Sequence, residues 1–421
     1  MKRNDVQRDT FILLQHGAFM KRILFVIPLP YGHDWGFWTR DAGLMVLTLR
    51  EMGYDAWLIA LGDAATVTED KPVLAVSLDD LNRPEWWKAQ RPDAVVLYTG
   101  SAPRHDRMRQ AALTATPRVV ERLDTDGARS ARLFPKLYYM RFWVRISEIL
   151  PPYARWLAPF PAAARTGLIY LFPMLMDIRM VRTMKRLPAV IAESPVAAAR
   201  IQQMFEKFSG AKHRVAMISH PVNEKVIRYD ATPKENQIIT VGRWASVQKD
   251  FPLLRKVLKG FLQRHPDWRA TVVGSGVPAR DRVPGNAAEE WQRRMTFHEN
   301  LTHEKIVEEY NRSKIYVMVS RCEGFSVAAS EALCCGCSVV SARVLASSTY
   351  TAEPQSGGIA ETRTSGAFLD TLDREVECWT KGERNPKAIA SVWSGRLGSH
   401  AVAQATLALL EDILPGAAPF K

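Results

Sequence analysis

Two glutamates on either side of a glycine turn and a helix start carry the clearest chemical signal in the sequence. The stretch EGFSVAASEALCCGC covers residues 323–337, and it holds Glu323 and Glu331 eight positions apart. The apolar run KIYVMVS before it predicts a strand, and VAASEALCC predicts a helix. Glu323 therefore falls on the turn and Glu331 on the helix, at different depths, so the two acids need not form an acid and base pair.

The turn after Glu323 has the features of an anion site. Gly324 gives the backbone freedom, and Ser326 is a residue type that caps helix N-termini. A helix that begins there presents free N–H groups and the positive end of its dipole, which suits a phosphate. Glu331, further along the helix, can accept hydrogen bonds from neutral hydroxyls such as those of a ribose.

Two basic residues upstream suit the same ligand. Arg243 and Lys249 stand six positions apart in VGRWASVQKD, directly after another apolar run. Arginine offers a planar fork and lysine a point charge, and together they fit a diphosphate in a cleft. The alternative is that both are solvated surface charges, as most Arg and Lys side chains are.

The cysteines favour packing over metal or redox chemistry. Four of the five cysteines lie close together near the glutamates, and the first 321 residues have none. This distribution does not form a disulfide framework, and it suits a reducing compartment. A zinc site usually needs two paired clusters or histidines at ligand spacing. We therefore expect Cys334, Cys335 and Cys337 to be buried thiols and expect no metal site.

The elements that must position these residues follow a repeating pattern. Apolar runs that read as buried strands alternate with helical segments, at 23–28, 56–61, 93–100, 118–123, 189–194, 237–244, 270–276, 314–320 and 337–342. This alternation predicts parallel sheets with helical crossovers. We predict an α/β fold with two doubly wound Rossmann-like domains that face a cleft and join near residues 220–236. Ligands of such sheets bind beyond the carboxyl ends of the strands.

Charge is concentrated in one segment. The 421 residues carry a net charge of +13, and residues 129–186 supply most of it, with eleven basic residues, two acids and many aromatics. This mixture suits an anionic membrane surface. The alternative is that these helices pack on the N-terminal domain with solvated charges. No nucleic-acid-binding motif accompanies the charge, so we expect no nucleic acid partner.

The first residues of the sequence do not read as a secretory signal peptide. Residues 1–19 contain no apolar run long enough for a secretory signal, and we expect a disordered leader or a misassigned start there. No uncharged apolar run reaches the length of a membrane span.

These motifs resemble the group 1 retaining glycosyltransferases of the GT-B fold, of the family 4-like kind. The resemblance rests on GRW…QKD, VVGSG and EGFSVAASEALCCGCSVVSA in the C-terminal half, and more weakly on PLPYGHDWGFWTRDAGLMVLTLREMGYDAWLIA and AVIAESPVAA…RVAMISHPVNEKVI upstream. It implies an acceptor-side domain over 20–222 with 129–186 as an insertion, and a nucleotide-sugar domain over 223–400. It also implies a final helix and tail, 401–421, that cross back to the first domain.

The resemblance also implies an activity. The chain would transfer a hexose-type sugar, with retention, from a nucleotide diphosphate sugar to a glycan or lipid-linked acceptor, without metal or other cofactor. The product would be a cell-surface polysaccharide or glycolipid. The expected location is cytoplasmic, peripheral on the inner face of the cell membrane.

Roles at the diphosphate follow from the same resemblance. Arg243 and Lys249 would hold the diphosphate and stabilise the leaving nucleotide. The backbone of Gly324, Phe325 and Ser326 would approach the phosphates or the sugar.

The sugar and the nucleoside would contact further residues. Glu323 would contact the donor sugar, and Glu331 would bind the ribose. Gly36 would approach the diphosphate from the other domain. The nucleobase would lie near residues 297–301, with Leu301 among its neighbours.

Two stretches depart from the family pattern, and the milder departure is the hinge, which reads HPVN at residues 220–223 where members carry N-G-V-D. Asp124 stands where members often carry a histidine, so the sugar contact expected there would be made by a carboxylate. Two other functions stay open on this account. A nucleotide-sugar epimerase of the same fold would need more acid and base residues in the cleft. Asp124 is the one feature that favours a non-catalytic nucleotide-sugar-binding protein with a degenerate site, whereas the intact Arg243, Lys249, Glu323 and Glu331 argue against it.

Overall fold

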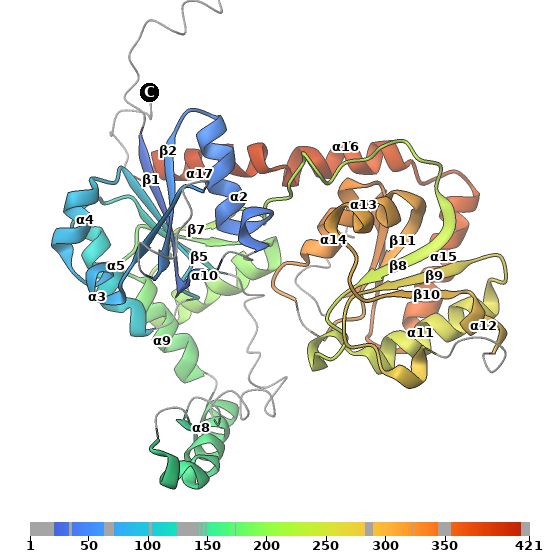
Figure 1. The fold of residues 1–421 in the computed structure, drawn as a ribbon, viewed down its shortest axis with the longest axis horizontal. Helices are drawn as coiled ribbons and strands as arrows, with labels where there is room; N and C mark the ends of the chain where they lie inside the picture. Colours follow the sequence, from blue (N-terminus) through green and yellow to red (C-terminus); the bar gives the residue numbers. More distant parts are fainter. Residues whose placement is uncertain are drawn as a thin grey trace, which may run out of the picture.

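The molecule consists of two α/β domains side by side, each built around one parallel sheet with helices on both faces (Figure 1). This computed structural model describes residues 21–32, 36–62, 71–100, 103–123, 143, 146–147, 150–172, 174–282, 289–321, 323–343 and 355–413. Neighbouring strands run parallel in both sheets. The predicted fold class is therefore confirmed.

The N-terminal sheet has seven strands in the order β3-β2-β1-β4-β5-β6-β7. The order reverses between β1 and β4, which is where such sheets open a ligand crevice. Every residue of β4, β5 and β6 is buried, as expected where helices cover both faces. The strands are β1 (Arg22–Pro30), β2 (Asp55–Leu61), β3 (Val73–Val76), β4 (Ala94–Leu97), β5 (Val119–Leu123), β6 (Ala189–Ala192) and β7 (Val215–Met217).

Helices connect these strands, and local sequence explains where they begin and end. In α10, for example, the Ser194 hydroxyl caps the Ala197 amide, Pro195 occupies the first turn and Gly210 ends the helix with a φ of 72°. The helices are η1 (Gly36–Trp38), α2 (Asp41–Glu51), α3 (Leu78–Leu81), α4 (Pro84–Gln90), η3 (Pro103–His105), α5 (Asp106–Leu113), η4 (Pro152–Leu157), α8 (Pro159–Leu171), α9 (Met174–Met184) and α10 (Pro195–Ser209).

The C-terminal sheet repeats the plan with six strands in the order β10-β9-β8-β11-β12-β13. Its strands are β8 (Glu235–Val241), β9 (Arg269–Val273), β10 (Met295–His298), β11 (Ser313–Val317), β12 (Ser338–Ala342) and β13 (Gly357–Ala360). Its helices, with the last two that lead back, are η5 (Val247–Lys249), α11 (Phe251–Arg264), η6 (Ala279–Asp281), α12 (Glu290–Arg293), α13 (His303–Arg312), α14 (Val327–Cys334), α15 (Ser365–Thr380), α16 (Pro386–Leu397) and α17 (Ser399–Asp412).

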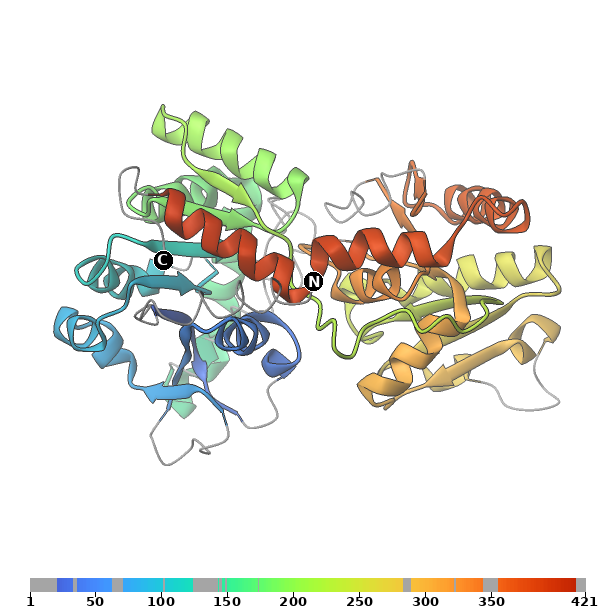
Figure 2. The same cartoon turned by 90° about the horizontal axis from the view of Figure 1, so that it is seen from above.

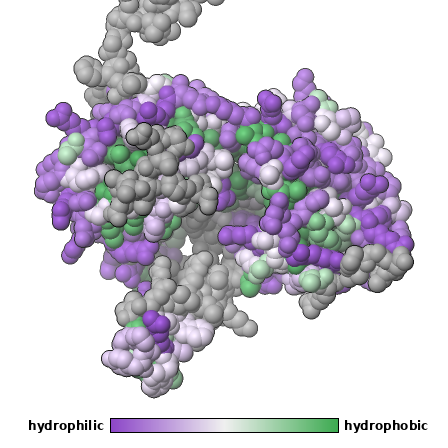
Figure 3. Space-filling model, viewed as in Figure 1, coloured by the Kyte–Doolittle hydropathy of each residue, from purple (hydrophilic) through white to green (hydrophobic). Residues whose placement is uncertain are grey.

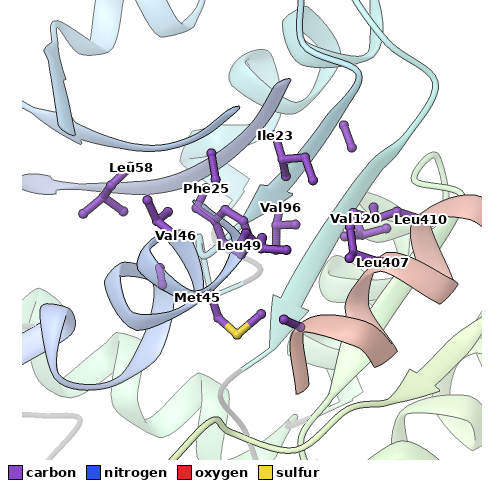
Figure 4. Packing of buried hydrophobic residues seen from close by; sticks show 14 of the residues in the cluster. Ile23, Phe25, Met45, Val46, Leu49, Leu58, Val96, Val120, Leu407 and Leu410 are labelled. Atoms are coloured by element: carbon purple, nitrogen blue, oxygen red, sulfur yellow. The ribbon is translucent and has the colours of Figure 1, made fainter. Parts of the chain in front are cut away.

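Alternate side chains of β1 fill the two sides of the N-terminal sheet. Ile23 and Phe25 join the cluster that includes α2 and α17, whereas Leu24 and Val26 join the cluster on the opposite face. Figure 4 shows Leu407 and Leu410 of α17 beside Val120 in the first of these clusters. The end of the chain thus completes the core of the first domain.

The chain crosses between the domains twice, and the two crossings touch. Residues 218–234 lead from β7 to β8, and the return lies between α16 and α17 (Figure 2). The Val222 amide donates to the Leu397 carbonyl at 2.7 Å, and the Ser399 amide donates to the Val222 carbonyl at 3.0 Å. Backbone hydrogen bonds therefore join the two crossings at the domain boundary.

The basic insertion leaves the N-terminal sheet at its carboxyl edge, because β5 ends at Leu123 and β6 begins at Ala189. Helix α9 packs into the domain through Val181 and Met184, whereas α8 stands away from it (Figure 1). No helix of the described part of the chain is long and apolar enough to span a bilayer. Residues 1–19 lie outside the described residues.

Candidate functional site

The loop after β8, which carries Arg243 and Lys249, is held by close contact with the loop after β9. The Trp244 amide donates to the Ser275 carbonyl at 2.8 Å, and the Trp244 indole donates to the Val273 carbonyl at 3.0 Å. Gly274 has a φ of 115°, and a Cβ there would lie 2.0 Å from the Gly242 carbonyl oxygen. Only glycine permits this approach.

Lys249 and Glu323 meet at the carboxyl edge of the second sheet. The Lys249 Nζ donates to Glu323 Oε1 at 2.6 Å, and Gln248 Nε2 donates to Glu323 Oε2 at 3.2 Å. Glu323 is 6% exposed, so this charge-assisted contact is largely shielded from water. The Arg321 amide also donates to the Gln248 carbonyl at 2.8 Å, which ties the loops after β8 and β11 together.

Arg243 is arranged differently from Lys249. Its side chain is exposed, and it forms no hydrogen bond or ion pair with any other residue that the structure describes. Lys249 is thus already paired with a carboxylate, whereas Arg243 is available to a ligand.

The turn after Glu323 leads directly into α14. The Ser326 hydroxyl accepts a hydrogen bond from the Ala329 amide at 3.4 Å, so the predicted N-cap is confirmed. Ala329, Ala332 and Leu333 are buried and anchor the helix in the domain core. The first amides of α14 therefore lie beside Glu323, with the positive end of the helix dipole.

Glu331 lies apart from Glu323 and has its own partners. Its Oε1 is 3.1 Å from His303 Nε2, and its Oε2 accepts from the Tyr310 hydroxyl at 3.4 Å. The hydrogen bond with Glu331 raises the pKa of His303, against burial and the charge of Arg40, which lower it. The sequence predicts that Glu331 accepts hydrogen bonds from ligand hydroxyls, and this stays a prediction. His303 and Tyr310, which contact its carboxylate, were not among the expected residues.

The N-terminal domain places a polar cluster at the carboxyl ends of β5, β6 and β7, beside the start of α2. His220 Nε2 lies 3.5 Å from Asp41 Oδ2, and the buried Arg122 guanidinium donates to Glu193 at 3.0 Å. Burial alone would raise the pKa of Asp41, but His220, Arg122 and Arg40 lower it overall. The His220 ring stacks on Phe325 of the C-terminal domain, with ring centroids 5.7 Å apart. Only the unusual HPVN join could have pointed to His220.

The remaining expected residues lie around this edge or outside the described chain. Gly36 begins η1, where a Cβ would lie 3.7 Å from Arg40 Nε. Leu301 is partly buried against the apolar cluster that contains Phe325. Asp124 lies outside the described residues.

The cysteines behave as packed thiols. Cys334, Cys335 and Cys337 are buried, and burial raises the pKa of the Cys334 thiol to about 12. Cys337 Sγ lies 3.0 Å from the Tyr310 carbonyl oxygen. Among the described residues, no group of three or more His, Cys, Asp or Glu side chains is placed to hold a metal ion.

Comparisons with known proteins agree with this architecture. Residues 223–390 match the family model of the glycosyl transferases group 1. No curated protein matches the chain.

Solved structures share the fold over nearly the whole chain. Anabaena HepE in complex with UDP is 15% identical, with a TM-score of 0.61 over 93% of this chain and 99% of that one. A glycosyltransferase from Rickettsia africae is 13% identical, with a TM-score of 0.62 over 95% and 100% of the two chains. The lipopolysaccharide outer core galactosyltransferase WaaB, in its apo form, is 12% identical, with a TM-score of 0.59 over 91% and 97%.

The structural likeness extends over nearly the full length of each chain, so it shows a shared fold despite the low sequence identity. The family match concerns the C-terminal domain. The chain therefore has the two-domain GT-B fold, and residues 223–390 of its C-terminal domain are similar to the glycosyl transferases group 1.

Proposed function

We propose that the protein is a retaining glycosyltransferase that moves a hexose-type sugar from a nucleotide diphosphate sugar to a glycan or lipid-linked acceptor. The observation that carries the proposal is the Lys249–Glu323 pair at 2.6 Å, placed beside the start of α14. A cation, a carboxylate and free helix amides at one sheet edge suit a phosphate joined to a hydroxyl-rich sugar. HepE, of the same fold, binds UDP and UDP-glucose.

The cations would act on the leaving diphosphate. Arg243 is available, and Lys249 has three N–H groups, so it can hold Glu323 and a phosphate oxygen together. When transfer occurs, the bond from the anomeric carbon to the phosphate oxygen breaks and its electron pair stays on that oxygen. The acceptor hydroxyl bonds to the anomeric carbon and its proton passes to the departing phosphate. Fixed positive charge stabilises that oxygen, so we propose a reaction without metal or other cofactor.

Other residues would orient the donor. Glu323 would accept hydrogen bonds from sugar hydroxyls, and Glu331 would accept them from the ribose. The backbone of residues 324–326 would lie along the phosphates, with Gly36 opposite. Leu301 would border the nucleobase, and Asp124 would contact the sugar.

We also propose that the enzyme works at the inner face of the cytoplasmic membrane, in cell-surface polysaccharide or glycolipid synthesis. Ten of the fifteen large apolar side chains that are exposed among the described residues fall within residues 143–175, which makes this segment the main apolar surface. Tyr153, Trp156 and Phe160 are 83%, 69% and 67% exposed. In Figure 3 the protrusion with α8 is mostly pale, whereas purple covers much of the two domains.

Charge and size fit a bilayer surface. Residues 150–172 and 174–186 expose six basic side chains, and their single acid, Asp177, is buried. Helix α8 has thirteen residues, about 20 Å, which is shorter than a bilayer core of about 30 Å. It would therefore lie in the headgroup region, with anionic lipid around the cations. The insertion that carries this surface leaves the acceptor-side sheet at its carboxyl edge, so we propose that a lipid-linked acceptor approaches the enzyme from this side.

A donor-binding screen tests the proposed function. Sugar nucleotides are added one at a time, and the melting temperature of the full chain is measured. One donor class should raise it for the wild type and fail to do so for Lys249→Ala. Lys256→Ala, at an exposed position on α11, serves as the matched control and should respond like the wild type. An equal response of Lys249→Ala, or no response to any sugar nucleotide, contradicts the proposal.

A further inference from the structure

One aromatic contact joins the N-terminal domain to the turn between the two glutamates. His220 lies after β7, where the chain leaves the first domain, and Phe325 lies between Glu323 and Ser326. The two rings are stacked, with centroids 5.7 Å apart and planes inclined by 25°. Both side chains are buried, so the contact lies in a packed part of the boundary between the domains.

The hydrogen-bond partners of His220 indicate its charge. Nδ1 lies 3.1 Å from the Pro221 carbonyl oxygen, and Nε2 lies 3.5 Å from the Asp41 carboxylate. Both partners only accept, whereas a neutral imidazole has one N–H, so the doubly protonated ring satisfies both contacts. Burial lowers the pKa of His220, but Asp41 and Glu193 together raise it overall.

The groups that face His220 come from several elements of the first domain. They are Asp41 at the start of α2, Arg122 on β5 and Glu193 after β6, while Phe325 faces it from the second domain. The charge of an imidazolium over the Phe325 ring adds attraction to the stacking.

The first domain holds this histidine firmly. Arg122 Nη2 donates to the carbonyls of Ile218 and Ser219, at 3.2 and 2.6 Å, which fixes the segment just before it. Asp41 begins α2 with a φ of 64°, a conformation that non-glycine residues adopt rarely and that persists only where the surroundings impose it. Both partners of the imidazole are therefore set by the fold of the N-terminal domain.

We propose that His220 is a positioning residue: its imidazolium, held by Asp41, fixes Phe325 and with it the turn that carries Glu323 and the start of α14. The contact would then tie the position of this turn to the N-terminal domain. What the turn binds rests on the proposed function, but the contact itself is testable without any ligand.

Hydrogen exchange of the unliganded full chain tests the contact. Protection of the amides of residues 324–330 is compared among the wild type, His220→Ala, Phe325→Leu and the double variant. Each single change should speed exchange about tenfold, the size expected for one cation–π contact, and the double variant should add little. Exchange equal to the wild type, or fully additive effects, would overturn the proposal.

A matched control is available within the C-terminal domain. His265 Nε2 also pairs with a carboxylate, that of Asp373, at 2.8 Å, and its ring centroid lies 4.6 Å from that of Phe261. Phe261 is on α11, His265 directly follows α11, and Asp373 is on α15, so this contact lies within one domain. His265→Ala should leave exchange at 324–330 unchanged.

The dependence on pH separates positioning from mere packing. In the wild type, protection of 324–330 should fall as pH rises through the raised pKa of His220, after correction for intrinsic exchange. Asp41→Asn should move that fall to lower pH, because it removes the main partner of the imidazolium. A fall at the same pH in both proteins would contradict the role of the ion pair. This variant also keeps the test sharp if His220→Ala fails to fold.

Activity then distinguishes the two proposals. If the wild type releases nucleoside diphosphate from a sugar nucleotide, His220→Ala should raise the donor KM about tenfold, whereas His265→Ala should not. Equal behaviour of the two variants would overturn the positioning role alone. A wild type with no release from any sugar nucleotide would overturn the proposed function, and the exchange result would still decide the contact.

Discussion

His303 orients the carboxylate of Glu331 in the candidate site. They lie 3.1 Å apart at the start of α13, and Tyr310 adds a second donor to the carboxylate. A ribose that binds Glu331 would meet a carboxylate whose orientation is already set. Such fixed acceptors lose little entropy when a ligand arrives.

This pair predicts a pH dependence. Because the hydrogen bond that His303 donates to Glu331 is the main cause of the raised His303 pKa, Glu331→Gln should lower that pKa. The stabilisation from the pair should be complete below about pH 6.5, the ordinary value for histidine, and should be lost as pH rises through the folded pKa. NMR titration of the His303 ring measures the shift. Glu308→Gln, an exposed acid one turn further along α13, is the control, and an equal shift in both variants would contradict the assignment.

Residues of the candidate site differ in how far the sequence could reveal them. Ser326 was predictable as a cap because its partner, Ala329, lies in the same turn. His220 and His303 were not, because their partners Phe325 and Glu331 belong to other elements that only the tertiary fold brings near.

At the scale of elements, the packed loops after β8 and β9 position the cations. Gly274→Ala would place a methyl group 2.0 Å from the Gly242 carbonyl oxygen and strain a φ of 115°. We expect a loss of about 1–3 kcal/mol in the free energy of unfolding, together with weaker donor binding. Urea unfolding measures the first and calorimetry the second.

The control for this change is another glycine. Gly366 lies in the first turn of α15, and a Cβ there would meet nothing within 4 Å. Gly366→Ala should be neutral or should stabilise by up to about 1 kcal/mol, because alanine favours helix. If Gly274→Ala were equally harmless, the close loop contact would not exist as described.

The strands of the fold were predictable where burial is continuous. Runs such as residues 23–28 of β1 and 94–97 of β4 are apolar throughout because helices cover both faces of the sheet. The short strands β3, β10 and β13 were not among the predicted runs. Strand β13 has the sequence GGIA with one buried residue, so its place at the sheet edge depends on pairing with β12 and not on its own composition.

At the scale of the whole molecule, α17 and the paired crossings join the two domains. The buried Leu410 of α17 lies in the core of the first domain, while α16 packs on the second. Motion of one domain against the other must therefore act at the hydrogen-bonded segment around Val222 and Ser399. His220 lies two residues from Val222, so such motion would act directly on its contact with Phe325.

The apolar protrusion predicts binding to membranes. Replacing Trp156 and Phe160 with glutamate should weaken binding of the full chain to phosphatidylglycerol vesicles by about tenfold or more, because each buried side chain contributes about 1.5–3 kcal/mol. Co-sedimentation at low and high salt measures it. Val392→Glu, an exposed apolar position on α16, is the control. A wild type that ignores anionic vesicles at low salt would contradict the membrane surface.

The most direct test of the account is release of nucleoside diphosphate from a sugar nucleotide, measured for the wild type, Lys249→Ala and Lys256→Ala in the presence of membrane lipid extract. We predict that the wild type and Lys256→Ala release it while labelled sugar appears in the lipid or glycan fraction. Lys249→Ala should be slower by about a hundredfold or more, because it lacks a fixed cation at the leaving group. Transfer by Lys249→Ala at the wild-type rate, or no transfer by the wild type from any donor, would contradict the claim that this sheet edge is the site of glycosyl transfer.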